Sequence, residues 1–223
     1  MRLLPFPWSF RGTEAAHANS SVDDNDEIVW ERAKMDAILR VRNDRAKTGR
    51  FDLARLSSGM PGVTPAFGQV LAETAAVCLE FGGHCPGVLF AVGGQFRCAL
   101  PVDWVSPTPQ QRRCYKDLQY ATEHGAYGVA ITVMQNRTGK IVIERSWKGT
   151  GFDYWIGRRQ GLLFQDKARL EVSGILSGDQ TNISTRVRQK VQQTKRSDGL
   201  LPAYIAIIEF GRPGAEIVWR PAS

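Results

Sequence analysis

The stretch that decides the fold reads Gly149-Thr-Gly-Phe-Asp153-Tyr-Trp-Ile-Gly157 and, after a short turn, Lys167-Ala-Arg-Leu-Glu171-Val-Ser173-Gly174. Asp153 enters the first predicted strand as a lone carboxylate. The second strand alternates between two faces: one carries Ala168, Leu170 and Val172, and the other carries Lys167, Arg169, Glu171 and Ser173. We predict a β-hairpin, with its turn at Gly157–Gly161, that brings the two carboxylates to one edge of a sheet.

These two carboxylates have two interpretations. Converging acids among basic residues are what a divalent metal over a phosphodiester requires. An ordinary amphipathic hairpin, whose acids pair with neighbouring arginines, carries the same residue types. The hairpin segment alone leaves both interpretations open.

The composition is that of a basic globular protein. The 223 residues, 43% of them hydrophobic, allow one substantial domain or one domain with an appended module. The 29 Lys and Arg against 22 Asp and Glu give a net charge of +7, compatible with a nucleic-acid partner. Pro5 and Pro7 interrupt any secretion signal, and no apolar run approaches the ~20 residues of a membrane span. The four cysteines fit no common zinc spacing. We expect a cytoplasmic protein without a membrane partner.

The N-terminal half predicts an arm and a small module. Residues 1–60 read as a flexible arm with one charged helix over Asp26–Thr48, which could dock on the main body or on a protein partner. Ser57–Pro65 has the composition of a linker. Residues 61–117 then hold a helix over Phe67–Phe81 and a hairpin around Gly93-Gly94.

The C-terminal half, residues 118–223, has the more informative order of elements. It predicts, in turn, a helix over Thr122–Arg137, a strand over Lys140–Arg145, the hairpin over Phe152–Gly174, a helix over Thr181–Lys195, a buried strand over Ala203–Phe210 and an edge strand over Glu216–Trp219. This order predicts an α/β fold, with a mixed central sheet flanked by helices and the N-terminal helix and hairpin as an extension.

That order, with those acids, resembles the PD-(D/E)XK nuclease superfamily, whose fold is restriction-endonuclease-like, and most nearly its Holliday-junction-resolvase-like branch. The branch opens with a helix carrying a Glu, then a Gly, a strand, an Asp motif and a Glu-x-Lys strand, before a basic helix and an apolar strand. The matching positions here are Glu123, Gly139, Asp153 in Gly151-Phe-Asp153, and Glu171-Val-Ser173. The resemblance covers about residues 118–212.

The resemblance implies a DNA endonuclease that uses Mg²⁺ or Mn²⁺, with RNA a less expected substrate. Asp153, Glu171 and the carbonyl of Val172 would bind the metal, and Glu123 would contribute directly or through water. Glu123 has a second interpretation as a first-turn helix acid with Thr122 as the N-cap.

One position departs from the family pattern. Ser173 stands where the family places a lysine that orients or activates the attacking water and offsets charge at the phosphate. Lys167 shares the strand face of Glu171 but lies about 13 Å away at ~3.3 Å per residue. Lys190, on the following basic helix, is the better candidate, and Arg186 lies one turn back on the same face.

The basic helix is expected to hold the nucleic-acid backbone. The residues concerned are Arg186, Arg188, Lys190 and Lys195. A merely solvated helix face would carry the same charges. Three other classes stay open: a degenerate nuclease fold that binds without cutting, an interaction component of a bacterial multi-protein system such as a defence system, and a structural protein. In the second class Asp153 and Glu171 would be paired with arginines.

Overall fold

The computed structural model describes residues 51–199 and 201–222. The strands of this range are β1 (Phe51–Asp52), β2 (Val88–Gly94), β3 (Cys98–Asp103), β4 (Ile141–Arg145), β5 (Tyr154–Gln160), β6 (Leu163–Ile175), β7 (Ala203–Glu209) and β8 (Gly214–Arg220). They form one eight-stranded mixed sheet in the order β1-β3-β2-β8-β7-β6-β5-β4. The predicted mixed α/β architecture is confirmed.

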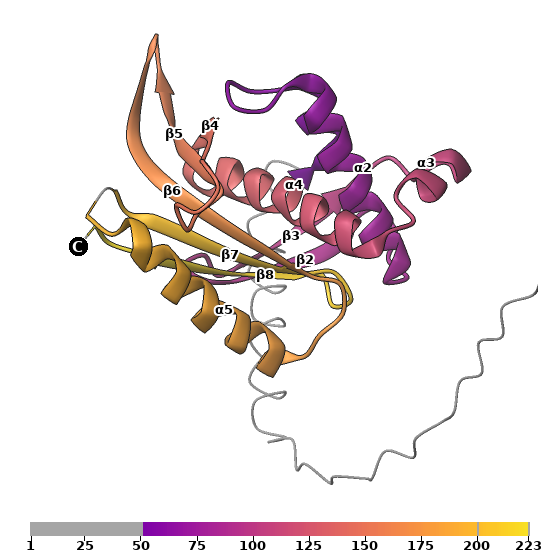
Figure 1. Ribbon diagram of the computed structural model, residues 1–223. Coiled ribbons are helices and arrows are strands. Elements are labelled where there is room, and N and C mark those ends of the chain that lie inside the picture. The colour runs from indigo at the N-terminus through magenta and orange to yellow at the C-terminus, as the bar shows by residue number, and fades with distance from the viewer. Residues whose placement is uncertain (1–50, 200, 223) are drawn as a thin grey trace, which may run out of the picture.

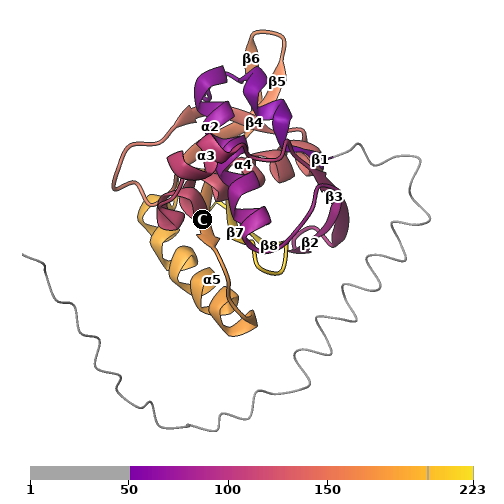
Figure 2. The ribbon, with the colours of Figure 1, turned by 90° about the vertical axis from the view of Figure 1, so that its right-hand side faces the viewer.

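Helices cover both faces of this sheet. They are α2 (Pro65–Phe81), α3 (Pro109–Cys114), α4 (Leu118–Thr138) and α5 (Gln180–Thr194), with 3₁₀ turns at Leu53–Ser58 and Lys195–Ser197. Figure 1 shows α4 and α5 on opposite sides of the sheet, and Figure 2 shows α5 below it with α2 and α4 above. None of the helices in the described residues is long and apolar enough to cross a membrane.

The helix α4 begins one turn earlier than predicted. The side chain of Asp117 caps it by accepting hydrogen bonds from the amides of Gln119 and Tyr120, at 3.0 and 3.3 Å. Thr122 therefore lies inside the helix and donates its hydroxyl to the carbonyl of Leu118 at 2.6 Å. The interpretation of Thr122 as the N-cap is wrong because an aspartate five residues earlier satisfies the first free amides.

The C-terminal half pairs as a meander followed by a crossover. β4, β5 and β6 are successively antiparallel, and β7 then runs parallel to β6. α5 makes the crossover and packs its apolar stripe on β7. That stripe comprises Ile183, Val187 and Val191, against Ile205 and Ile207. The 180–194 helix thus covers one face of β6 and β7, while α4 covers the other.

β8 is an interior strand, not the predicted edge strand. It pairs antiparallel with β7 over its whole length and parallel with β2 from Ala91↔Gly214 to Gly94↔Ile217. Its inward residues Ala215 and Ile217 are buried in the main core. The strand itself is present, but a local sequence pattern does not show how many neighbours a strand has. Residues 88–103 and the C-terminal half therefore share one sheet.

Residues 51–65 belong to the folded body. Phe51, Leu53 and Leu56 are buried in the main core, although the prediction placed them in a flexible arm. A Cβ on Gly68 would lie 1.9 Å from the carbonyl oxygen of Leu56, so α2 packs directly on this backbone. The predicted linker over Ser57–Pro65 is wrong, because its Gly and Pro residues form a compact turn. The predicted helix over Asp26–Thr48 lies outside the described residues.

The turn of the β5–β6 hairpin is shifted from its predicted place. β5 continues to Gln160 and β6 begins at Leu163, so the turn is Gly161-Leu162, with Gly161 at φ 60°. Gly157 lies instead at a β-bulge between Ile156 and Arg158. A glycine in a strand pattern marked a bulge rather than a turn.

Candidate active site

A polar cavity of about 750 Å³ opens beside β6 and is lined by residues of α4 and α5. The cavity forms because β6 extends beyond the point where its pairing with β5 stops. β5 pairs with β6 only up to Tyr154↔Leu170. The next residues of β6 therefore have β7 on one side and the cavity on the other. Its lining includes Glu123 and Tyr127 from α4, Asp153, Glu171 and Ser173 from the sheet edge, and Arg186, Lys190 and Gln193 from α5.

Asp153 is held at this edge by two donors. Its Oδ2 accepts a hydrogen bond from the backbone N–H of Val172 at 2.8 Å. A neighbouring strand would accept this bond if β5 extended that far. Its Oδ1 accepts the hydroxyl of Tyr127 at 3.1 Å, and the same hydroxyl lies 3.2 Å from Oε1 of Glu123. Burial and the charge of Asp153 raise the pKa of Tyr127, so this hydroxyl stays protonated and donates.

Glu171 is almost completely buried beneath α5. Its Oε1 accepts Nζ of Lys190 at 2.5 Å and Nε2 of Gln193 at 3.0 Å. Its Oε2 is buried and meets no hydrogen-bond donor in the described residues. The predicted polar face of β6 is therefore the face toward α5, while Leu170 and Val172 on the other face join the main core.

The two carboxylates interact with each other, and among the described residues Lys190 is the cation that forms an ion pair with them. Burial and the charge of Asp153 raise the pKa of Glu171 to about 8, although Lys190 opposes both effects. Burial likewise raises the pKa of Asp153, against the Val172 amide and Lys190. Two carboxylate oxygens are both acceptors, so they can share a hydrogen bond only through a proton. The pair will therefore bind either a proton or a cation.

The donor set fits a hard divalent cation. Mg²⁺ is commonly held by one or two carboxylates and keeps several waters, and the unpaired Oε2 of Glu171 is a free oxygen beside Asp153. The Val172 amide faces Asp153 rather than β7, and the carbonyl of a strand residue faces the same side as its amide. Within the described residues no group of three or more His, Cys, Asp or Glu side chains could hold a metal. Glu123 reaches Asp153 through the Tyr127 hydroxyl.

Comparison with known proteins finds no matching family model, no matching curated protein and no matching solved structure. A function for the chain therefore rests on the geometry of its own site.

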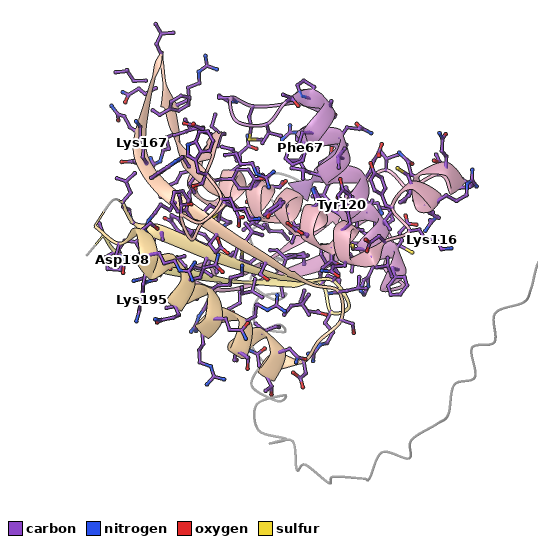
Figure 3. All side chains as sticks on the ribbon, in the orientation of Figure 1. Phe67, Lys116, Tyr120, Lys167, Lys195 and Asp198 are labelled. Carbon is purple, nitrogen blue, oxygen red and sulfur yellow. The ribbon has the colours of Figure 1, made fainter. Side chains whose placement is uncertain are left out.

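Two of the four basic residues predicted on α5 line the cavity. Lys190 contacts Glu171, and Arg186 donates Nη1 to the hydroxyl of Ser173 at 2.8 Å. Arg188 is exposed, lies within 3.3 Å of the Thr185 hydroxyl, and lines another hollow. Lys195 is exposed beyond the end of α5 and lines a third. Lys167 lies on the projecting part of the β5–β6 hairpin (Figure 3).

The alternative in which arginines neutralise both acids differs from this arrangement. Among the described residues, the ion pair of Glu171 is with Lys190, and Asp153 forms no ion pair with an arginine. Arg169, which the alternation placed on the same strand face, is fully buried. It binds the carbonyls of Thr194 and Leu201 instead.

Sequence reasoning missed two residues of the site, Tyr127 and Gln193. Each stands at a helical spacing from a residue that was singled out. Tyr127 is four residues after Glu123, and Gln193 is three residues after Lys190. A search of the helix faces around the chosen acids and lysine would have found both.

Proposed function

We propose that this protein is a metal-dependent nuclease that hydrolyses phosphodiester bonds of DNA. The observation that carries the proposal is the contact between Asp153 and Glu171 at the open edge of β6. The pair is buried, and its two negative charges face the one ammonium of Lys190. A pair of this kind in a polar cavity is a candidate for metal-assisted hydrolysis.

The arrangement of elements supports the same proposal. The helix α4, the antiparallel β4, β5 and β6, the crossover helix α5 and the parallel β7 follow the order of the restriction-endonuclease-like core. Of the positions matched to the PD-(D/E)XK motif, Asp153 immediately precedes β5, and Glu171 lies on the neighbouring β6.

A divalent cation held by Asp153 and Glu171, with the carbonyl of Val172, would act as a Lewis acid and lower the pKa of a bound water. The chain's own residues set the geometry. The Val172 amide and Tyr127 orient Asp153, and Lys190 and Gln193 orient Glu171.

The position of Ser173 also has a physical account. Arg186 is held by the neutral Ser173 hydroxyl rather than by a carboxylate, so its charge is available for a phosphate. Lys190 forms an ion pair with Glu171, and we propose that it takes the role that the family gives to its lysine. We infer that α5 supplies both cations and that Ser173 positions Arg186.

The test is cleavage of labelled duplex, single-stranded and branched DNA with Mg²⁺ or Mn²⁺. We expect Asp153→Asn and Glu171→Gln to abolish activity. Lys190→Ala should lower kcat by about 10²-fold or more. Lys195→Ala, on the same basic segment but outside the cavity, is the matched control and should stay near wild type. Wild type that is inert with every metal and substrate, or an active Asp153→Asn variant, would overturn the proposal.

Ser173→Lys separates a relocated lysine from a lost one. With Lys190 serving the site, a second ammonium beside Arg186 should lower activity or leave it unchanged. A large gain of activity in Ser173→Lys would show that Lys190 does not have this role.

A further inference from the structure

The outer part of the β5–β6 hairpin stands clear of the sheet. β4 pairs with β5 only as far as Ile141↔Gly157, and β7 first pairs with β6 at Arg169↔Ala203. Residues 158–167 therefore pair only with each other and form a two-stranded ribbon. Figures 1 and 2 both show this ribbon projecting beyond the helices.

The base of the ribbon is fixed in orientation. The bulge at Gly157 bends β5, as bulges do, just where the ribbon leaves the sheet. Lys140 is buried at this point and donates Nζ to the carbonyl of Asp166 at 2.5 Å. Arg158 and Asp166 form an exposed ion pair at 3.3 Å. A ribbon anchored in this way presents its tip in a defined direction.

The surface of the ribbon combines an apolar tip with cationic sides. Leu162 is 94% exposed and Leu163 is 70% exposed. Arg158, Arg159 and Lys167 are exposed along the two strands, and Asp166 is the acid among residues 158–167. A lone two-stranded ribbon is only marginally stable, and exposed leucines do not help it. Such a surface is suited to a polyanion that also offers apolar contact.

We propose that residues 158–167 are an arm that grips duplex DNA about one helical turn from the carboxylates; this inference rests on the proposed function. Arg158, Arg159 and Lys167 contact phosphates, and the leucine tip enters a groove. A two-stranded ribbon fits the major groove, and leucine is among the side chains that wedge between base steps in the minor groove.

The length of the ribbon sets the length of DNA that it needs. Leu162 follows Asp153 by nine residues. At ~3.3 Å per residue the tip reaches about 30 Å from the carboxylate. At ~3.4 Å per base pair this is about nine base pairs, so a shorter duplex bound at the cavity cannot reach the tip.

The test is DNA binding, measured by fluorescence anisotropy without divalent metal, with one duplex of about 8 and one of about 20 base pairs. Arg158→Ala/Arg159→Ala should bind the long duplex about tenfold more weakly and lower its salt slope by about 1.8, because each lost phosphate contact removes about 0.9. Leu162→Ser/Leu163→Ser should bind the short duplex within about twofold of wild type, because the tip lies about nine base pairs from the carboxylate. The same variant should weaken binding of the long duplex without changing the salt slope of that binding.

A charge-matched control separates the arm from general attraction. Arg112→Ala/Arg113→Ala removes two cations from α3, at the opposite end of the molecule in Figure 1, and should affect neither duplex. Thermal unfolding of all variants should match wild type, because the ribbon lies outside the core.

The outcomes distinguish this inference from the proposed function. If the ribbon variants bind the long duplex as wild type does, while wild type cleaves DNA, the DNA-binding arm is disproved and the nuclease proposal is retained. The exposed leucines would then belong to a protein contact. Equal losses in the ribbon and α3 variants would also overturn the arm. If wild type binds neither duplex and cleaves no DNA, the nuclease proposal falls and the arm falls with it.

Discussion

Two buried tyrosines beside the carboxylates differ in the hydrogen-bond partners of their hydroxyls. Tyr127 and Tyr154 pack edge to face, with ring centroids 5.4 Å apart. The Tyr127 hydroxyl lies between Glu123 and Asp153, whereas the Tyr154 hydroxyl is buried with no hydrogen-bond partner in the described residues. In this aromatic pair, one hydroxyl is therefore hydrogen-bonded and the other is buried without a hydrogen bond.

This pair makes a matched prediction for the free energy of unfolding. Tyr127→Phe should destabilise the protein by about 1–3 kcal/mol, because it leaves Oδ1 of the buried Asp153 without its hydrogen-bond donor. Tyr154→Phe should be neutral or stabilising by up to about 1 kcal/mol, because it removes a buried group that costs free energy. Urea unfolding of both variants measures the difference. An equal loss in both would contradict the assignment of their hydroxyls.

The buried Glu171 predicts how stability depends on pH in the metal-free protein. Its pKa is about 8 in the folded state and near 4.5 when unfolded, so the folded state holds more protons between these values. Stability should therefore fall as pH rises from about 4.5 to about 8 and level off above. Urea midpoints with EDTA should fall less steeply for Glu171→Gln than for wild type over this range. Parallel profiles would show that Glu171 titrates normally.

At the scale of residues, the sequence predicts which acids lie at the sheet edge but not what surrounds them. Alternation along residues 167–173 assigned each side chain to a face, and the motif selected Asp153 and Glu171. Alternation could not show that α5 seals the polar face, so Arg169 and Glu171 are buried rather than solvated. Only the packing of distant segments reveals that burial.

At the scale of elements, α5 depends on a buried clamp at its C-terminal end. Arg169 donates to the carbonyls of Thr194 and Leu201 and to the Ser197 hydroxyl, at 2.6–3.0 Å. Asp198 pairs with Arg169 at 3.4 Å. Free helix carbonyls are thereby satisfied close to Lys190 and Gln193. The clamp holds the end of α5 that carries two of the cavity residues.

We predict that Arg169→Ala destabilises the protein by about 3–5 kcal/mol, as the loss of a buried, paired charge does. Amide exchange along α5 should speed up more than exchange in β7. The control is Arg188→Ala on the exposed side of α5, which should change stability by no more than about 0.5 kcal/mol. If Arg169→Ala unfolded at the wild-type urea midpoint, the clamp would carry no stability.

Element boundaries were predictable where local chemistry sets them and unpredictable where pairing does. The apolar stripe of α5 and the strand over residues 203–209 follow directly from periodicity. The start of α4 was missed because Asp117 lies before the apolar pattern. The sequence predicts β8 as an edge strand because its second neighbour, β2, lies about 120 residues earlier in the chain.

At the scale of the whole molecule, β8 joins two sets of strands. β1, β3 and β2 lie on one side of it, and β7, β6, β5 and β4 on the other. α2 also packs closely on α4, where a Cβ on Gly125 would lie 2.9 Å from the Ala75 backbone. The predicted division at residue 117 therefore crosses both a helix contact and a continuous sheet.

We predict that residues 61–117 do not fold alone. Their strand β2 lacks β8, and their helix α2 lacks α4, so much of their apolar surface stays in water. Circular dichroism and NMR of this fragment should show an unfolded chain, whereas residues 51–223 should unfold in one cooperative transition. A well-dispersed NMR spectrum of the fragment would establish an independent module instead.

The position of β8 in the sheet also delays the pairing of β2 during biosynthesis. β2 meets its partner across about 120 residues, from Ala91 to Gly214. At about 5–20 residues per second, a ribosome needs roughly 6–24 s to make that interval. Throughout this time the edge of β2 is an open template for pairing with other nascent chains. The completed sheet is closed there, but its assembly gives chaperones a long-lived strand edge to shield.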